Sequence, residues 1–180
     1  MDQTLETERL TLRPFVPEDA PVVQKLAGNP NVAFMIARVP HPYPDGLAEA
    51  WIAGHAAERA RGDAYTFAIE YAGQLVGSIG LTRGAQGYAL GYWLGEPWWG
   101  QGFATEAAHR AVRFAFEDLD LAALLASHRV DNAASGRVLA KCGFQYTGDG
   151  MQWSAALGKE LPVRRVALTR ERFEAISRSR

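Results

Sequence analysis

The sequence predicts a layered α+β fold, with a mixed, mostly antiparallel central sheet of about seven strands and helices on both faces. One observation is that four stretches of the first half alternate apolar and polar residues, as antiparallel strands joined by short turns do: 5–15, 64–71, 74–82 and 88–94. The other is an amphipathic helix pattern over 105–116 followed by a strand pattern over 121–128. With the strand before them, these two elements predict a parallel, right-handed β-α-β unit.

The N-terminal part is expected to combine one strand with helices. Leu10 and Leu12 alternate with polar residues, which predicts a strand over 5–15 that ends in a proline-containing segment. Helices are expected over 17–27, 31–38 and 47–61. The loop before the last helix has three prolines within 40–44, and two interpretations of it stay open. It is either a stiff pocket wall that holds Tyr43 or a plain connection between helices.

The remaining chain supplies the later strands and helices. After the hairpin of 64–82, the strand, helix and strand of the β-α-β unit follow one another. Asn132 is suited to cap the next helix, and Gly143 is placed to end it in a left-handed conformation. One strand is expected to start at 144–146 and a later one to span 163–169, with the Met151–Trp153 region in a loop between them.

The composition is that of a globular protein without a strong charge. A length of 180 residues, 48% of them apolar, predicts a single domain over 1–180. The formal net charge of −1 predicts no nucleic acid and no membrane surface as a partner. Cys142 is the only cysteine, so no intrachain disulfide forms. No apolar run approaches the roughly 20 residues of a spanning helix, and the acidic start at Met1–Glu6 is unlike a secretory signal, so we expect a cytoplasmic protein.

The stretch from Trp98 to Ala108 contains the clearest candidate for a binding site. Gly100 and Gly102 have no Cβ, so the backbone can turn tightly and bring its N–H groups close to a ligand. The first N–H groups of the following helix have no partner within that helix, and the helix dipole adds partial positive charge there. A phosphate or pyrophosphate is the usual ligand of such a turn. The alternative is a tight turn that binds nothing.

This stretch is close to the dinucleotide-binding pattern G-x-G-x-x-G, but two features count against that interpretation. Thr105 stands where the third glycine would permit close packing of helix and sheet. An antiparallel meander precedes the turn and only about 75 residues follow it, which leaves little room for a doubly wound sheet. The sequence also has no G-K-[ST], so a P-loop is excluded.

Five further motifs occur in a fixed order along the chain. They are Thr7-Glu8-Arg9-Leu10-Thr11-Leu12-Arg13, Gly73-Gln74-Leu75-Val76-Gly77-Ser78-Ile79-Gly80, Tyr92-Trp93-Leu94 with Pro97 to Ala107, Asn132-Ala133-Ala134-Ser135, and Lys141-Cys142-Gly143-Phe144. In this order and spacing they resemble the GNAT superfamily of acetyl-CoA-dependent N-acetyltransferases, most of all its branch of Rim-type ribosomal-protein N-terminal acetyltransferases. The resemblance covers nearly the whole chain. One departure is Trp99, which stands where the superfamily's pyrophosphate pattern has Gln or Arg, so no contact of its side chain with the pyrophosphate is expected.

The resemblance implies that acetyl passes directly from the thioester of acetyl-CoA, the co-substrate, to an amine, with no acyl-enzyme and no metal. The pyrophosphate would lie on backbone N–H groups of the glycine turn, and the pantetheine arm would pair with the edge of the 88–94 strand. A backbone N–H at this edge would polarise the thioester carbonyl. The resemblance assigns cofactor binding to Tyr92, Leu94, Gly100, Gln101, Gly102, Phe103, Ala104, Thr105, Asn132 and Arg137.

Glu96 and Ser135 are the candidate catalytic residues. Glu96 follows the cofactor strand and would accept a proton from the amine, directly or through water; the alternative is an exposed turn residue. By similarity Ser135 would protonate the departing thiolate, although Ser135 and Asn132 also suit a plain helix start. His41 and His128 are reserve bases, with a structural or surface role as the alternative for each.

The acceptor site is expected between the early helices and the late β-loop, with Tyr43, Trp51 and Trp153 as substrate-binding residues. Such aromatic walls suit a protein N-terminus or a small-molecule amine, so the expected partners are acetyl-CoA and one of these acceptors. The chain is expected to be a monomer or a homodimer. Two other functions stay open: a non-catalytic acyl-CoA-binding sensor of the same fold, and a dinucleotide-dependent oxidoreductase.

Overall fold

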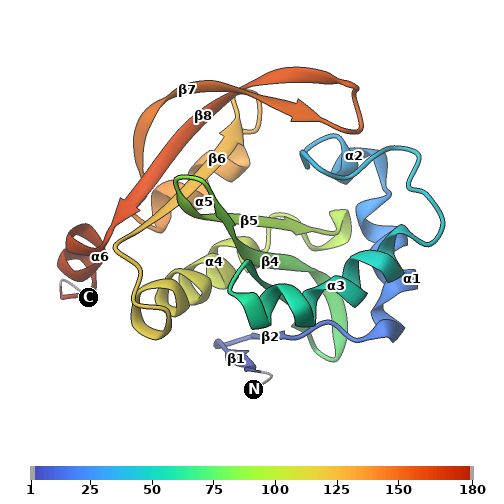
Figure 1. Cartoon of the computed structure of the whole chain (residues 1–180), viewed down its shortest axis with the longest axis horizontal. Coiled ribbons are helices and arrows are strands. Elements are labelled where there is room, and N and C mark those ends of the chain that lie inside the picture. Colours follow the sequence, from blue (N-terminus) through green and yellow to red (C-terminus); the bar gives the residue numbers. More distant parts are fainter. Residues whose placement is uncertain (1–2, 179–180) are drawn as a thin grey trace.

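An eight-stranded sheet forms the centre of the fold in a computed structural model that describes residues 3–178 (Figure 1). The strand order is β1-β2-β3-β4-β5-β6-β8-β7, and each neighbouring pair is antiparallel except β5 and β6, which are parallel. The strands are β1 (Leu5–Glu6), β2 (Leu10–Arg13), β3 (Ala64–Tyr71), β4 (Gln74–Gly84), β5 (Gly87–Leu94), β6 (Ala123–Arg129), β7 (Gln145–Ser154) and β8 (Lys159–Thr169). The predicted mixed, mostly antiparallel sheet with a parallel β-α-β unit is confirmed, and the expected strand number is close.

The segment 5–15 is a hairpin of β1 and β2 and not the single strand that its alternation predicts. Leu5 pairs with Leu12 across the hairpin. The N–H of Thr7 donates to the carbonyl of Leu10 at 2.9 Å, and its hydroxyl oxygen accepts from the N–H of Leu10 at 2.8 Å, which closes the turn. The prediction is wrong here because four consecutive polar residues, 6–9, interrupt the alternation, and the chain turns back within them.

The Met151–Trp153 region lies in a strand and not in the predicted loop. β7 runs to Ser154 and pairs with β8 along its whole length, with Met151 opposite Pro162 and Trp153 opposite Glu160. Two glycines in β7 and an irregularity of register after Tyr146 interrupt the alternation of apolar and polar residues by which a strand is recognised. The last two strands therefore form a long, largely exposed hairpin, seen at the top of Figure 1.

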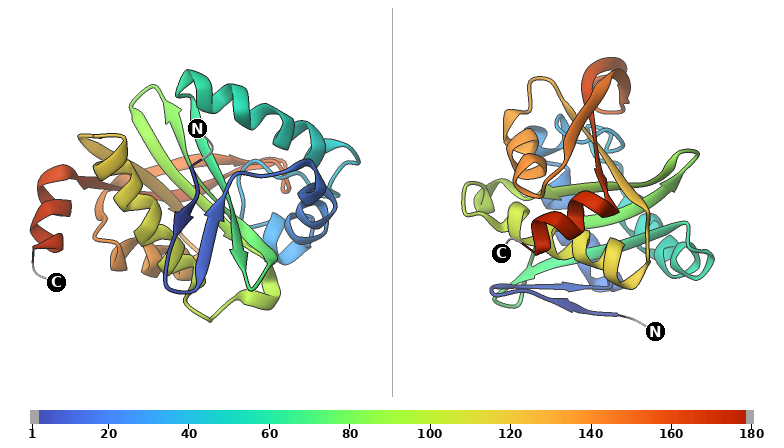
Figure 2. Two further views of the ribbon diagram at one scale, coloured as in Figure 1. Left: turned by 90° about the horizontal axis from the view of Figure 1, so that it is seen from below. Right: turned by 90° about the vertical axis from the view of Figure 1, so that its left-hand side faces the viewer.

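Helices cover both faces of the sheet, as predicted (Figure 2). They are α1 (Ala20–Ala27), α2 (Pro30–Ala33), α3 (Leu47–Arg61), α4 (Phe103–Arg113, continued by a π-helical turn), α5 (Ala133–Lys141) and α6 (Arg170–Ser177). α1 and α3 pack with Ala68 of β3 in a small apolar cluster, whereas α4 packs with Phe67 in the main core. Successive strand residues point to opposite faces, so these two clusters lie on opposite sides of the sheet.

The second predicted helix, 31–38, is much shorter in the structure. α2 begins at Pro30, after Asn29 as its N-cap, and ends at Ala33. Residues 34–38 form turns and bends instead. An isolated helical segment of this length has too few hydrogen bonds to extend itself, so its surroundings decide where it ends.

β5 and β6 separate where the sequence predicts the site. Their parallel pairing consists of Ala89 with Leu125 and Leu90 with Ala126, so residues 91–94 of β5 continue beyond it. The end of β5 thus offers backbone groups on the side that faces β6. Among residues 3–178, no helix has the length and apolar character needed to cross a membrane.

Candidate active site

The glycine turn leads from β5 into α4, as the sequence predicts. Gly100 and Gly102 have φ values of 75° and 83°, in the left-handed region that side chains rarely adopt. Gly102 is the N-cap of α4, so the N–H groups of Phe103, Ala104 and Thr105 have no partner within the helix. The side chain of Phe103 is only 1% exposed, which leaves its backbone to face a ligand. This end of α4 can bind an anion through amide N–H groups and the helix dipole.

An ion pair that the sequence analysis missed braces the glycine turn. Arg9 donates to both oxygens of Glu106 through its backbone N–H and its Nε, at 2.8 and 2.7 Å, and Nη1 donates to the Gln101 carbonyl at 3.1 Å. Thr7 adds a hydroxyl hydrogen bond of 2.6 Å to Glu106. Burial acts to raise the pKa of Glu106, but the bonds from Thr7 and Arg9 outweigh it and hold that pKa below its ordinary value. The negative charge next to the anion site is thereby neutralised.

Ser135 lies in the first turn of α5, where it meets the side chain of Tyr92 from β5. The Oδ1 of Asn132 accepts a hydrogen bond of 3.1 Å from the Ser135 N–H, so the predicted N-cap is confirmed. The Tyr92 hydroxyl lies 2.8 Å from Ser135 Oγ and donates to the Ser135 carbonyl at 3.2 Å. Burial raises the pKa of Tyr92 to about 12. Arg137 is exposed on the same helix, one turn from the cap.

Glu96 follows β5 and lies against the start of α2. Its Oε2 accepts a hydrogen bond of 2.7 Å from Asn29 Nδ2, and its Oε1 accepts one of 2.9 Å from Asn31 Nδ2. The carboxylate is therefore held in one place by two neutral amides and is only half-buried. Neither asparagine was expected from the sequence. The run of Asn, Pro and Asn at 29–31 indicates only a turn or a helix start, and no local pattern indicates a hydrogen-bond partner 65 residues away.

Leu94 and Trp99 show how the end of β5 is arranged. The Leu94 side chain is 8% exposed and packs in the core, so any contact with a cofactor falls to its backbone. The indole Nε1 of Trp99 donates to the Leu94 carbonyl at 2.9 Å. Trp99 therefore caps the end of the strand, which gives its side chain a role other than pyrophosphate binding.

The three residues predicted for the acceptor lie in two places. Tyr43 and Trp51 both pack against the apolar cluster under α1 and α3. Trp153 is not part of that cluster; it is 58% exposed on β7. Of the reserve bases, His41 packs against the ring of Phe34, just after α2. His128 forms a hydrogen bond between its Nδ1 and the backbone carbonyl of Arg129, and its ring lies against α5.

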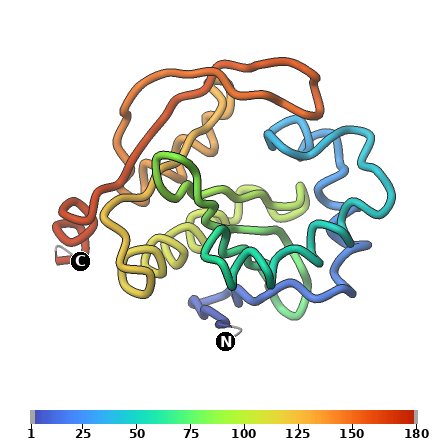
Figure 3. The backbone as a smooth tube through the Cα atoms, viewed as in Figure 1, coloured from blue at the N-terminus to red at the C-terminus, as the bar shows by residue number. Residues whose placement is uncertain are grey.

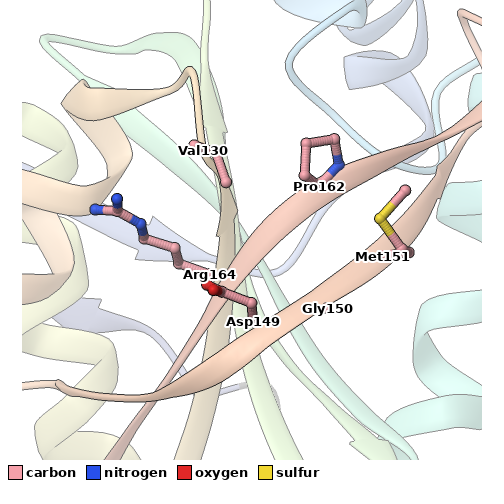
Figure 4. A pocket seen from close by; sticks show the side chains of 6 residues that line it. All are labelled: Val130, Asp149, Gly150, Met151, Pro162 and Arg164. Carbon is pink, nitrogen blue, oxygen red and sulfur yellow. The ribbon is translucent and has the colours of Figure 1, made fainter.

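The hairpin of β7 and β8 carries a hollow of about 460 Å³. Figure 4 shows Val130 and Arg164 on one side of it and Met151 and Pro162 on the other, with Asp149 between them. Met151, in the Met151–Trp153 region expected at the acceptor site, lines it, whereas no residue predicted for the cofactor or the catalytic step does. It lies on the exposed hairpin and not in the gap between β5 and β6.

A family model described as "Acetyltransferase (GNAT) domain" matches residues 9–145. The match spans most of the chain and includes β5, the glycine turn, α4 and α5. The chain therefore belongs to the GNAT acetyltransferase family, and the predicted enzyme class, an acyltransferase, is confirmed.

Two Bacillus proteins are among the relatives of this chain. It is 26% identical to "Uncharacterized N-acetyltransferase p20" of Bacillus licheniformis, over 95% of this chain and 98% of that protein. It is 31% identical to "Uncharacterized N-acetyltransferase YoaA" of Bacillus subtilis, over 80% of this chain and 84% of that protein.

Solved structures agree with the predicted fold. RimJ of Mycobacterium smegmatis, in complex with CoA-disulfide, has a TM-score of 0.81 at 23% identity, over 98% of this chain and 96% of that one. The ribosomal L7/L12 acetyltransferase RimL, in complex with coenzyme A, has a TM-score of 0.82 at 19% identity, over 93% and 98%. At this identity the likeness shows the fold alone.

Proposed function

We propose that this protein is an N-acetyltransferase that transfers acetyl from acetyl-CoA directly to a primary amine. The observation that carries the proposal is the separation of β5 from β6 beside the glycine turn. One continuous path then leads from an anion site, along a free strand edge, to Ser135 and Glu96. RimJ and RimL, which share the fold, are described in complex with CoA-disulfide and coenzyme A, which supports CoA as the ligand of this path.

The cofactor is held mainly by backbone groups in this proposal. The N–H groups of Gln101 to Thr105 bind the pyrophosphate, and the edge of β5 at Tyr92 to Leu94 pairs with the amides of the pantetheine arm. At the start of α5, the half-buried Asn132 contacts the pantetheine arm and the exposed Arg137 contacts a phosphate. The Arg9–Glu106 ion pair fixes the position of the glycine turn.

The amine attacks the thioester carbonyl, forming the C–N bond and expelling the CoA thiolate. Glu96 accepts the amine proton directly or through one water, and a backbone N–H at the end of β5 stabilises the oxyanion. Both side chains that bind the Glu96 carboxylate are neutral amides, so neither competes as a cation with the incoming amine. Ser135 donates a hydrogen bond to the departing sulfur of CoA, and the ordinary pKa of a thiol is roughly 8.5.

The acceptor is a protein N-terminus or a small-molecule amine. An α-amino group has a pKa of roughly 7.7–8.0 against about 10.4 for lysine, so a single carboxylate suffices to deprotonate it. Tyr43 and Trp51 on one side and Trp153 on the other supply apolar walls for the group next to the amine.

A panel of amines tests the proposal. Peptides with different N-termini, amino acids and polyamines are mixed with acetyl-CoA, and thiol release is followed for the protein and for Glu96→Gln. We expect release above the background hydrolysis with at least one class of acceptor, and its loss in the variant. Binding of CoA without acceptor-dependent release would instead indicate an acyl-CoA sensor, and tighter binding of NAD than of CoA an oxidoreductase.

A further inference from the structure

The contact between Tyr92 and Ser135 joins the free edge of β5 to the first turn of α5. Its two hydrogen-bonding distances, 2.8 Å to Ser135 Oγ and 3.2 Å to the Ser135 carbonyl, place one phenol hydroxyl against both oxygens of the serine. We propose that Tyr92 is a positioning residue, which directs the hydroxyl proton of Ser135 toward the departing sulfur of CoA. This inference rests on the proposed acetyl transfer and assigns Tyr92 a function beyond contact with the pantetheine arm.

Two arrangements of hydrogen atoms fit the observed distances. In one, Tyr92 donates to the Ser135 carbonyl and accepts the proton of Ser135 Oγ, so the serine has no proton to offer. In the other, Tyr92 donates to Ser135 Oγ, and the serine proton is free to point elsewhere. Rotation of the two hydroxyl groups interconverts them without movement of any heavy atom.

The charge that develops during the reaction selects the second arrangement. When the C–S bond breaks, its electron pair remains on sulfur, and a thiolate next to Ser135 attracts the serine proton. Ser135 Oγ then becomes a better acceptor, and donation from Tyr92 strengthens it, as expected for linked hydrogen bonds. The backbone of Ser135 is already fixed by the Asn132 cap, so only the hydroxyl rotors need to adjust.

No net proton transfer from Tyr92 is required. The Tyr92 pKa of about 12 lies well above the roughly 8.5 of a thiol, so the phenol keeps its proton while it donates. The amine proton passes to Glu96, and the CoA thiolate leaves with a hydrogen bond from Ser135 and takes a proton from water on release. Atoms and charges therefore balance without a tyrosinate or an alkoxide.

Kinetics of single and double variants test the inference. Removal of the direct donor in Ser135→Ala is expected to lower kcat about a hundredfold, and Tyr92→Phe about tenfold. Both variants should leave the Kd of CoA within about twofold of the wild type, because the pyrophosphate cradle is untouched. In the Ser135→Ala background, Tyr92→Phe should produce no further loss, since Tyr92 acts through the serine.

Tyr88→Phe is the matched control. Tyr88 lies on the same strand and also donates its hydroxyl to a backbone carbonyl, that of Gly62, at the opposite end of β5 from the glycine turn. Its kcat should equal that of the wild type. Full activity of Tyr92→Phe, or the same tenfold loss in the presence and absence of the Ser135 hydroxyl, would overturn the inference.

A second measurement needs neither turnover nor a Tyr92 variant. In protein labelled with ¹³C at tyrosine Cζ, CoA is added to the wild type and to Ser135→Ala, and the Tyr92 resonance is followed. At a pH above the roughly 8.5 of the CoA thiol, we expect CoA to shift it further in the wild type than in Ser135→Ala, because the pantetheine arm contacts the strand in both. Equal shifts in the two proteins would overturn the inference. Absence of transfer in the wild type with this shift present would count against the proposed reaction alone.

Discussion

At the cofactor end of the gap between β5 and β6, the groups available to a ligand belong mostly to the backbone. They are the N–H groups after Gly100 and Gly102 and the edge of residues 91–94 that faces β6, apart from the Leu94 carbonyl, which Trp99 occupies. At the acceptor end, the available groups are side chains from distant parts of the chain. Glu96, for example, is held by asparagines more than 60 residues away. A site made of backbone groups depends on conformation and tolerates many sequences, which suits a cofactor that stays the same. A site made of side chains depends on which residues are present, which suits acceptors that differ.

The segment around α2 is the main structural element of the acceptor end. It contacts the end of β5 through Glu96, and Arg129 at the end of β6 donates to the carbonyl of Phe34. The N–H of Ala155, between β7 and β8, donates to the carbonyl of Ala37 at 2.8 Å. Figure 3 shows this pale blue stretch beside the end of the hairpin, so the two halves of the molecule meet there.

Glu96→Gln should have the largest effect and should confine it to the acceptor end. Loss of the proton acceptor is expected to lower kcat at pH 7 about a hundredfold, while CoA binding stays unchanged. Steady-state rates and calorimetric titration with CoA measure the two effects. The exposed Glu174 on α6 provides the control, since Glu174→Gln should leave both quantities as they are. Equal losses in CoA affinity and in kcat would contradict the separation of the two ends.

Gly102→Ala should produce the opposite pattern. An alanine at φ 83° is strained, and relaxation of the backbone would displace the N–H groups of the anion site. We therefore expect CoA to bind about tenfold more weakly. Gly73→Ala, in the β3–β4 turn at φ 76°, introduces the same kind of strain far from the site. Both variants should lose similar stability, but only the first should lose affinity in calorimetric titration. Unchanged affinity in Gly102→Ala would show that the turn does not bind the pyrophosphate.

Glu106→Gln tests the support behind the cofactor end. Loss of the charge from a carboxylate bound by Thr7 and Arg9 is expected to reduce the free energy of unfolding by about 1–2 kcal/mol in urea titrations. The exposed Arg113–Glu117 pair is the control, and Glu117→Gln should cost only about 0.3–0.5 kcal/mol. The pKa of Glu106 is lowered in the folded state, so this stabilisation is present above the unfolded pKa and is lost as the pH falls through the folded one. If the difference in free energy of unfolding between the wild type and Glu106→Gln did not shrink on acidification, stabilisation by the charged Glu106 carboxylate would be refuted.

His55→Phe should have the smallest effect, at the acceptor end. His55 packs edge-on to Trp51, with ring centroids 4.5 Å apart, and both its ring nitrogens are buried without a hydrogen-bond partner. Burial, aided by Arg59, lowers the pKa of His55 to about 4. Between pH 6.5 and 4 the unfolded chain binds a proton that the folded one does not, so stability falls as the pH falls.

The titration of His55 is expected to reduce the free energy of unfolding by about 1 kcal/mol, after allowance for the solvent screening of a partly exposed group. Urea titrations at pH 7 and pH 4.5 measure it, and His55→Phe should lose less stability between these two values than the wild type. An equal loss in both proteins would show that His55 does not titrate in this range.

The sequence predicted most of what depends on local pattern. The glycine turn, the Asn132 cap and the hairpin of β3 and β4 follow from neighbouring residues, and the structure contains all three. The contacts of Tyr92 with Ser135 join residues 43 positions apart, and no periodicity signals such a pair. β7 escaped prediction because two of its residues are glycines, which remove the apolar alternation of an exposed edge strand.

Direct transfer across the gap between β5 and β6 is tested most directly by initial rates over a grid of acetyl-CoA and amine concentrations. In the proposed reaction both substrates occupy the gap together, since Glu96 and Ser135 lie at the same end of β5 as the glycine turn. Double-reciprocal lines that intersect are therefore expected, together with an unmodified protein after incubation with acetyl-CoA alone. Parallel lines, with an acetyl group found on the protein by mass spectrometry, would contradict the account.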